Sequence, residues 1–138
     1  PGQRPDNPYC GVFARFFATV MAGDAPRVHG DGEQTRDYTY VDDAVEATLL
    51  AGISPKAEGQ VYNVGTGRET SVNELARGII RVVGADISPE HVDRRDIDNI
   101  RRRVTSIERI RRELRWVPSV TLEQGLERTY AWLGTATS

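Results

Sequence analysis

The sequence predicts an α/β domain with four to five helices and few strands, about three, each of them short. Segments with the periodicity of an amphipathic helix alternate along the chain with short runs rich in β-branched and aromatic residues. Glycine, proline and helix-capping residues mark the ends of most of these segments. At 138 residues, the chain has room for one compact domain.

The first helix is predicted over residues 9–22. Asn7 is a suitable N-cap, Pro8 fits the first turn, and Gly23 ends the helix. One face is apolar and carries Val12, Phe13, Phe16, Phe17 and Val20. Because these spacings repeat every three to four residues, this face is expected to pack in the core.

A short strand at residues 27–29 and an extended segment at residues 35–40 follow, separated by a glycine-rich turn. Asp42 or Asp43 can then cap a helix that runs to about Ala51. The inner face of this helix is expected to carry Val41, Val45 and Leu49.

The second half of the chain predicts one strand and three helices. The strand covers residues 61–64 and ends at the glycines of residues 65–67. A capping box of Ser71 and Glu74 opens a helix that runs through Val83. A short helix begins within residues 105–108 and closes at residues 116–118, and the last helix runs from residue 121 to about residue 133. Trp116 and Trp132 are expected to be core residues.

This inventory contains few strands for its number of helices. A parallel sheet needs several strands and has both faces covered. Three strands of about four residues do not provide that. We therefore expect the helices to cover a sheet whose other strands lie outside this chain, and the chain to be truncated.

Composition excludes several classes of protein. Hydrophobic residues make up 38% of the chain and charged residues 28%, which is typical of a soluble globular protein. The apolar runs are much shorter than a transmembrane helix, and no secretory signal is visible. Cys10 is the only cysteine, and His29 and His91 are the only histidines. We therefore expect no disulfide framework, no metal site, no membrane partner and a cytoplasmic location.

Positive charge is concentrated in one region. The net charge is −2, yet residues 94–115 contain nine arginines against four acidic residues. Guanidinium groups bind phosphate through paired donors, so this region favours a small anionic ligand. A nucleic-acid-binding domain is usually basic over a whole face, and we expect no nucleic-acid partner. Runs of charge mostly face solvent, which is the expectation for Arg101, Arg102 and Arg103.

Residues 30–43 carry the most informative motif, G-D-G-E-Q-T-R-D-Y-T-Y-V-D-D. The two glycines permit a tight reversal, after which Arg36 projects beside Asp37. On composition alone, a hairpin turn with a surface Arg–Asp pair is the simpler interpretation.

Four ordered segments together resemble the extended short-chain dehydrogenases of the NAD-dependent epimerase/dehydratase family. They are residues 30–43, residues 61–75 with the motif Y-N-V-G-x-G, residues 114–132 with the motif L-x-W-x-P, and the turn at residues 1–3. Each segment is a weak signal alone, but the set covers nearly the whole chain. The resemblance is greatest to the UDP-glucose 4-epimerases, and it implies the C-terminal, substrate-binding part of an extended Rossmann-type enzyme.

The resemblance also implies a substrate site for a UDP-sugar. His29 would lie against the base, and Arg36, in the same motif as Gln34, would contact the diphosphate. Arg94, Arg95 and Asp96 match the family's R-x-G-D segment, whose arginine clamps the diphosphate. Asp96 would hydrogen-bond a ribose hydroxyl or orient an arginine. Arg95 replaces the family's glycine, so the choice between Arg94 and Arg95 as the clamp stays open.

Two motifs that the family's chemistry requires are absent from this sequence. It has no glycine-rich dinucleotide motif, and no tyrosine is followed by lysine four residues later, since Lys56 is the only lysine. We therefore expect neither catalytic nor cofactor-binding residues here. NAD would be bound mainly by an absent N-terminal half, and this chain alone, residues 1–138, would bind the nucleotide sugar without turnover.

Other functions stay open at this stage. Within the family, a nucleotide-sugar 4,6-dehydratase or a UDP-glucuronate-processing enzyme is the alternative to an epimerase. If it is not part of an enzyme, the chain is a non-catalytic nucleotide-sugar-binding module. The full-length enzyme could also form a homodimer.

Overall fold

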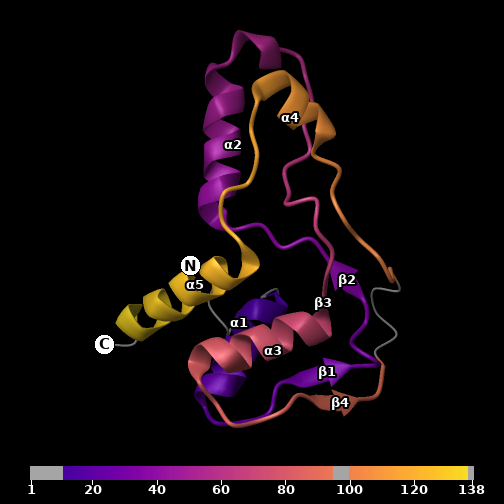
Figure 1. The fold of residues 1–138 in the computed structure, drawn as a ribbon, viewed down its shortest axis with the longest axis vertical. Coiled ribbons are helices and arrows are strands. Elements are labelled where there is room, and N and C mark those ends of the chain that lie inside the picture. Colours follow the sequence, from indigo (N-terminus) through magenta and orange to yellow (C-terminus); the bar gives the residue numbers. More distant parts are fainter. Residues whose placement is uncertain (1–10, 95–99, 137–138) are drawn as a thin grey trace.

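The computed structural model describes residues 11–94 and 100–136, and within these ranges the chain has the predicted α/β character. The elements in chain order are α1 (Val12–Met21), β1 (Arg27–His29), β2 (Thr35–Arg36), α2 (Val41–Ile53), the 3₁₀ turn η1 (Pro55–Ala57), β3 (Thr70–Ser71), α3 (Val72–Val83), β4 (Glu90–Val92), α4 (Glu108–Leu114) and α5 (Leu122–Ala136). They form an elongated molecule with α2 and α4 at one end and β1 and β4 at the other (Figure 1).

The strands form two separate two-stranded sheets. β1 pairs with β4 in parallel, and β2 pairs with β3 antiparallel. The prediction of a strand at residues 61–64 is wrong, because this β-prone segment forms no ladder with another described segment. A strand requires a partner, and the described part of the chain supplies none there.

The larger hydrophobic cluster lies between α1, α3, α5 and β1. It consists of Phe16, Phe17, Val20, Val28, Val72, Leu75, Ala76, Ile79, Ile80 and Leu126. The α3 residues recur every three to four positions, so one face of the helix is fully apolar. The predicted apolar face of α1 is confirmed, with Phe16, Phe17 and Val20 buried and Val12 and Phe13 partly buried.

A smaller cluster joins α2 to α4 at the other end of the molecule. Its buried members are Ala47, Ile110, Leu114 and Trp116, and Tyr62 packs against them. Trp116 is a core residue, as predicted. Trp132 is not in either buried cluster and instead lines a pocket, so its prediction as a core residue is wrong.

The inner face predicted for α2 is wrong. Val41, Val45 and Leu49 are 45%, 50% and 63% exposed, and the buried α2 residues are Asp43 and Ala47. At about 100° per residue, the two groups lie on nearly opposite sides of the helix. α2 is apolar on both sides, and the described residues cover only one of them.

Asp42 and Asp43 are not N-caps of α2. The N-cap is Tyr40, with no side-chain capping bond, and the two aspartates lie in the first turn. Asp43 is only 1% exposed and accepts hydrogen bonds from the Ser119 amide and hydroxyl at 2.9 Å and from the Val120 amide at 3.1 Å. It therefore fixes the segment between α4 and α5 against α2.

The start of α3 follows its local sequence signal, whereas the starts of α1 and α2 do not. The predicted capping box at α3 is confirmed, with the Glu74 amide donating to Ser71 Oγ and the Ser71 amide donating to the Glu74 carboxylate. Helix α1 begins at Val12 rather than at Tyr9, with Gly11 as its N-cap, and the predicted cap Asn7 lies outside the described residues.

Among the described residues, no helix is both long and apolar enough to cross a lipid bilayer.

Candidate functional site

A pocket of about 460 Å³ lies between α1, the end of β1, β2 and the start of α3. We call it the cationic pocket. Its charged and polar lining consists of Arg15, Arg27, His29, Asp31, Gln34, Arg36, Arg94 and Arg101. Val12, Phe16 and Val72 contribute an apolar wall. The pocket therefore combines five arginines and a histidine with one carboxylate.

Four of the six predicted site residues line this pocket. They are His29, Gln34, Arg36 and Arg94. Arg95 and Asp96, the other two, lie outside the described residues. Arg94 follows the other three by about sixty positions in the sequence, so only the fold explains its proximity to them.

The glycine turn at residues 30–32 forms one edge of the pocket. Gly30 and Gly32 have φ angles of 74° and 71°, in the left-handed region that favours glycine. A Cβ at Gly32 would overlap Oδ1 of Asn73, so a larger residue there would displace the Asn73 side chain. The side-chain amide of Asn73 donates to the backbone carbonyl of Asp31 at 2.8 Å and to Glu33 Oε1 at 2.6 Å. Asn73, at the start of α3, was not identified from sequence because its partners lie about forty residues away.

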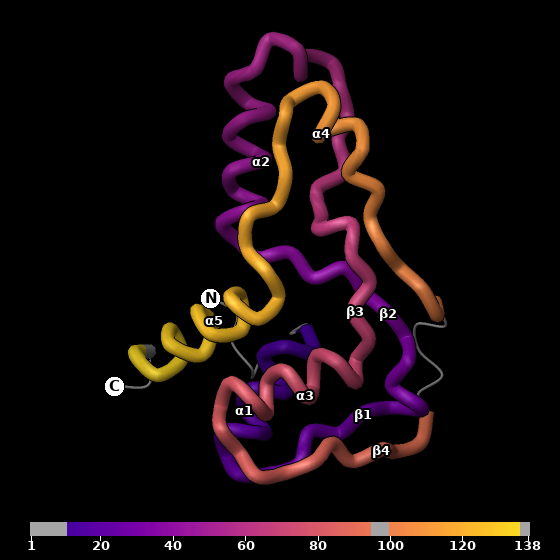
Figure 2. The backbone as a smooth tube through the Cα atoms, viewed as in Figure 1, coloured from indigo at the N-terminus to yellow at the C-terminus, as the bar shows by residue number. Residues whose placement is uncertain are grey.

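Arg36 links β2 to the segment that follows the undescribed residues 95–99. Its Nη1 donates to the carbonyl of Thr35 at 2.7 Å and to that of Ile100 at 3.0 Å. The Thr35 amide also donates to the Arg101 carbonyl at 2.9 Å. Figure 2 shows this part of the chain passing beside β2. Arg36 is therefore held in place at the pocket by backbone contacts.

Arg101 and Asp31 form a bidentate ion pair at the pocket. Both guanidinium nitrogens Nη1 and Nη2 lie 2.8 Å from the two carboxylate oxygens of Asp31. The hydrogen bonds from Arg101, followed by that from the Glu33 amide, lower the pKa of Asp31 to about 2. Arg101 is largely exposed, at 58%, as expected for a run of charge, but it also lines the pocket, which was not expected. Arg102 pairs instead with Glu69 at 3.0 Å.

His29 and Gln34 hold the end of β1. The His29 Nδ1 lies 3.0 Å from the Asp93 carbonyl, which accepts the hydrogen bond. The Gln34 amide donates to the His29 carbonyl at 3.2 Å. Arg94 follows Asp93 directly and packs over Gly30, where a Cβ would lie 3.7 Å from Arg94 Cβ. The β1–β4 pairing therefore brings His29 and Arg94 to the same end of one sheet.

Asp37 does not form the surface pair with Arg36 that composition alone favours. It accepts hydrogen bonds from the amides of Thr66, Gly67 and Thr105 and from the Thr66 hydroxyl. A Cβ at Gly65 would lie 2.7 Å from Asp37 Oδ2. The backbone amides of the glycine turn at residues 65–67 therefore bind the carboxylate of Asp37.

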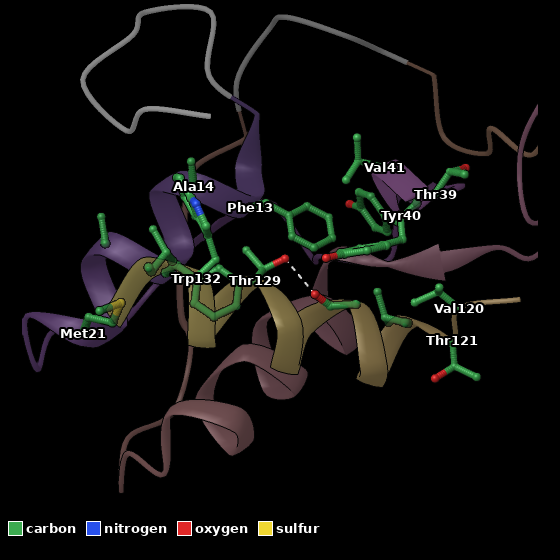
Figure 3. A pocket seen from close by; sticks show the side chains of 16 residues that line it. Phe13, Ala14, Met21, Thr39, Tyr40, Val41, Val120, Thr121, Thr129 and Trp132 are labelled. Carbon is green, nitrogen blue, oxygen red and sulfur yellow. Dashed lines mark hydrogen bonds between the residues drawn. The ribbon is translucent and has the colours of Figure 1, made fainter. Parts of the chain in front are cut away.

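A second pocket, of about 380 Å³, is almost entirely apolar (Figure 3). We call it the apolar pocket. Phe13, Ala14 and Met21 of α1 face Trp132 of α5 across it, and Tyr40 closes one end. None of its lining residues is charged, so it is unsuited to an anionic ligand. Tyr38 lines both pockets, and burial raises the pKa of its hydroxyl.

The charges that line the cationic pocket are suited to a multiply charged anion. Arginine donors bind phosphate oxygens in pairs, and the apolar wall offers a surface for a flat ring. No group of three or more histidine, cysteine, aspartate or glutamate side chains within residues 11–94 and 100–136 could hold a metal ion. Recognition of an anionic small molecule is the chemistry that this arrangement supports.

Residues 3–129 match the family model described as GDP-mannose 4,6 dehydratase. A UDP-glucose 4-epimerase of Mycolicibacterium smegmatis is 42% identical, with 94% of this chain and 40% of that protein covered. A UDP-N-acetyl-alpha-D-glucosaminuronate decarboxylase of Bacillus cytotoxicus is 36% identical, covering 92% and 41%. The chain thus spans about two fifths of the length of these curated relatives.

Solved structures agree with these relatives. The UDP-glucose 4-epimerase of Thermotoga maritima with UDP-glucose has a TM-score of 0.89 and 35% identity, covering 100% of this chain and 43% of its own. A UDP-glucuronic acid 4-epimerase of Bacillus cereus in complex with UDP-glucuronic acid and NAD has a TM-score of 0.82 and 26% identity, covering 99% and 42%.

Proposed function

Because the chain belongs to the family of NAD-dependent nucleotide-sugar epimerases and dehydratases, we propose that its cationic pocket binds the diphosphate of a UDP-sugar. The observation that carries this proposal is the position of Arg36 and Arg94 on one pocket with His29. Arginines from separate segments supply several N–H donors to one anion. The T. maritima relative, whose structure contains UDP-glucose, supports the choice of ligand.

The two sides of the pocket suit the two ends of a nucleoside diphosphate. The arginines would contact the phosphate oxygens, and the His29 ring would lie against the base. Val12 and Phe16 offer an apolar surface beside them. The sugar would extend out of the pocket toward groups that carry out the chemistry.

The reaction that we propose for the whole enzyme is epimerisation at C4 of the sugar. The 42% identity to the M. smegmatis UDP-glucose 4-epimerase supports an epimerase over a decarboxylase. Within the described residues, the chain's own part in that reaction is to bind and orient the diphosphate. The proposed role is therefore substrate recognition.

The described residues do not fit an NAD site. A dinucleotide pyrophosphate binds where a glycine-rich turn joins a strand to a helix N-terminus. Here the turn at residues 30–32 joins β1 to β2, and the first turn of α3 is capped by Ser71 and Glu74. We therefore propose that NAD is bound by a part of the enzyme outside this chain.

The surface of α2 supports the view that this chain is the substrate-binding portion of a larger enzyme. Val45, Leu49 and Ile53 are at least half exposed on the side of α2 opposite its buried face. The segment at residues 61–64, which follows α2, is β-prone and has no strand partner among the described residues. An exposed apolar helix face followed by a β-prone segment is typical of a layer in an α/β fold. We propose that the rest of the enzyme covers them.

Calorimetric titration tests the binding proposal. UDP-glucose is expected to bind the wild-type chain saturably at one site, and Arg94→Gln is expected to weaken it by about tenfold, or about 1.4 kcal/mol. Arg77→Gln is the matched control, because it removes the same charge from an exposed position of α3 outside the pocket. Equal weakening by both variants, or no binding to the wild type, would contradict the proposal.

A further inference from the structure

The Arg101–Asp31 pair is the feature of the cationic pocket that the motifs do not explain. Both side chains line the pocket and are somewhat more than half exposed, at 58% and 56%. Exposed ion pairs contribute little to stability, so stability is a weak reason for this one. Its geometry is nevertheless well defined, with two parallel hydrogen bonds of 2.8 Å.

Asp31 is anchored on its own side of the pair. Its Oδ1 also accepts a hydrogen bond from the Glu33 amide at 3.0 Å. It lies between Gly30 and Gly32 in a turn that Asn73 holds against α3. Contacts that do not involve Arg101 therefore set the position of the Asp31 carboxylate.

Arg101 is anchored at its backbone. Its carbonyl accepts a hydrogen bond from the Thr35 amide of β2, and its guanidinium is fixed by Asp31. A guanidinium has five N–H donors in one plane, and the bidentate pair uses two of them. Donors on the remaining edges are left for a ligand.

We propose that Arg101 is a further phosphate ligand and that Asp31 is its positioning residue. This inference rests on the proposed function. Asp31 holds the guanidinium at the pocket so that an arriving diphosphate meets an ordered donor. Ordering a flexible arginine on binding costs affinity, and the pair removes that cost in advance. Arg101 also neutralises the carboxylate, which alone would repel the phosphates.

This proposal and simple charge repulsion predict opposite effects of Asp31→Asn on the affinity for UDP. Removing a carboxylate from an anion site should tighten binding if the carboxylate only repels the ligand. If Asp31 positions Arg101, Asp31→Asn should instead weaken UDP binding by about threefold. When Arg101 is already changed to Gln, only the repulsion remains, and adding Asp31→Asn should then tighten binding.

Calorimetry with UDP on the wild-type chain, Arg101→Gln, Asp31→Asn and the double variant tests this. Arg101→Gln is expected to weaken UDP by about tenfold, with little change for uridine, which lacks phosphate. Arg101→Lys keeps the charge but not the bidentate geometry and should recover only part of the loss. Circular dichroism checks that each variant is folded.

Distinct outcomes separate this proposal from the binding proposal. No UDP binding by the wild-type chain overturns both. Binding that is weakened by Arg94→Gln but unchanged by Arg101→Gln overturns the role of Arg101 alone. Tighter binding by Asp31→Asn in the wild-type background overturns the positioning role of Asp31.

Discussion

Three aspartates in this chain have different partners and therefore different tasks. Asp31 pairs with a guanidinium at the cationic pocket. Asp37 and Asp43 accept hydrogen bonds from backbone amides and a hydroxyl of distant segments. In the sequence all three stand near a turn or a helix start, where aspartate is common. Only their spatial partners distinguish the residue that lines the cationic pocket from the two that hold distant segments together.

The pKa of Asp31 leads to a pH prediction. Arg101 lowers this pKa from 3.8 to about 2. Because the folded-state pKa is below the unfolded one, the contribution of the pair to stability is present above about pH 4 and is lost as the pH falls through about 2. An NMR titration of the Asp31 carboxyl carbon should give a midpoint near 2.

The same titration in Arg101→Gln is the control. Its midpoint should rise toward 3.8, since the largest cause of the shift is gone. An unchanged midpoint would mean that the Glu33 amide, rather than Arg101, sets the pKa.

Asp43 leads to a stability prediction. Asp43→Ala would leave the amide of Ser119 and the buried amide of Val120 without their acceptor. We expect a loss of about 2–4 kcal/mol in the free energy of unfolding, measured by urea denaturation. Asp42→Ala is the matched control: its ion pair with Arg128 is 3.7 Å long and exposed, so its loss should stay below about 1 kcal/mol. Equal losses would contradict the role of Asp43.

At the scale of the elements, local signals predicted the helices better than the strands. The reciprocal bonds of Ser71 with Glu74 join residues three apart, so the start of α3 is visible in the sequence. β4 was missed, because it exists through pairing with β1 more than sixty residues away. Residues 61–64 have the composition of a strand but no described partner.

Helix α2 shows why a periodic pattern can indicate the wrong face. Its apolar residues surround most of the helix, so the pattern does not reveal which side this chain covers. The buried side is set by Asp43, whose partners lie beyond α4. The periodicity of apolar residues does not predict a polar residue on the buried side of a helix.

The cationic pocket was predictable in part. The resemblance at residues 30–43, at His29 directly before them and at Arg94 led to four residues that line it. The Asp31–Arg101 pair was not predictable, since its members are 70 positions apart and lie in segments with separate interpretations. Asn73 was missed for the same reason. These contacts depend on how the turn at residues 30–32 meets α3 and the segment at residues 100–101, which is a property of the folded chain.

At the scale of the whole molecule, the exposed side of α2 leads to a prediction about association. Leu49 is 63% exposed, so Leu49→Glu should change the free energy of unfolding by less than about 0.5 kcal/mol. By adding charge to an apolar surface, it should reduce self-association in light scattering. Ala47→Glu, on the fully buried side of the same helix, should unfold the chain. Similar destabilisation by both changes would contradict this account of α2.

The central claim is that this chain recognises the diphosphate of a nucleotide sugar at the cationic pocket. A crystal structure of the chain with UDP-glucose tests it most directly. We expect oxygen atoms of the two phosphates to accept hydrogen bonds from Arg36 and Arg94, with the base beside His29. Phosphate density elsewhere on the molecule, with the Arg36 and Arg94 side chains directed away from the ligand, would contradict the claim.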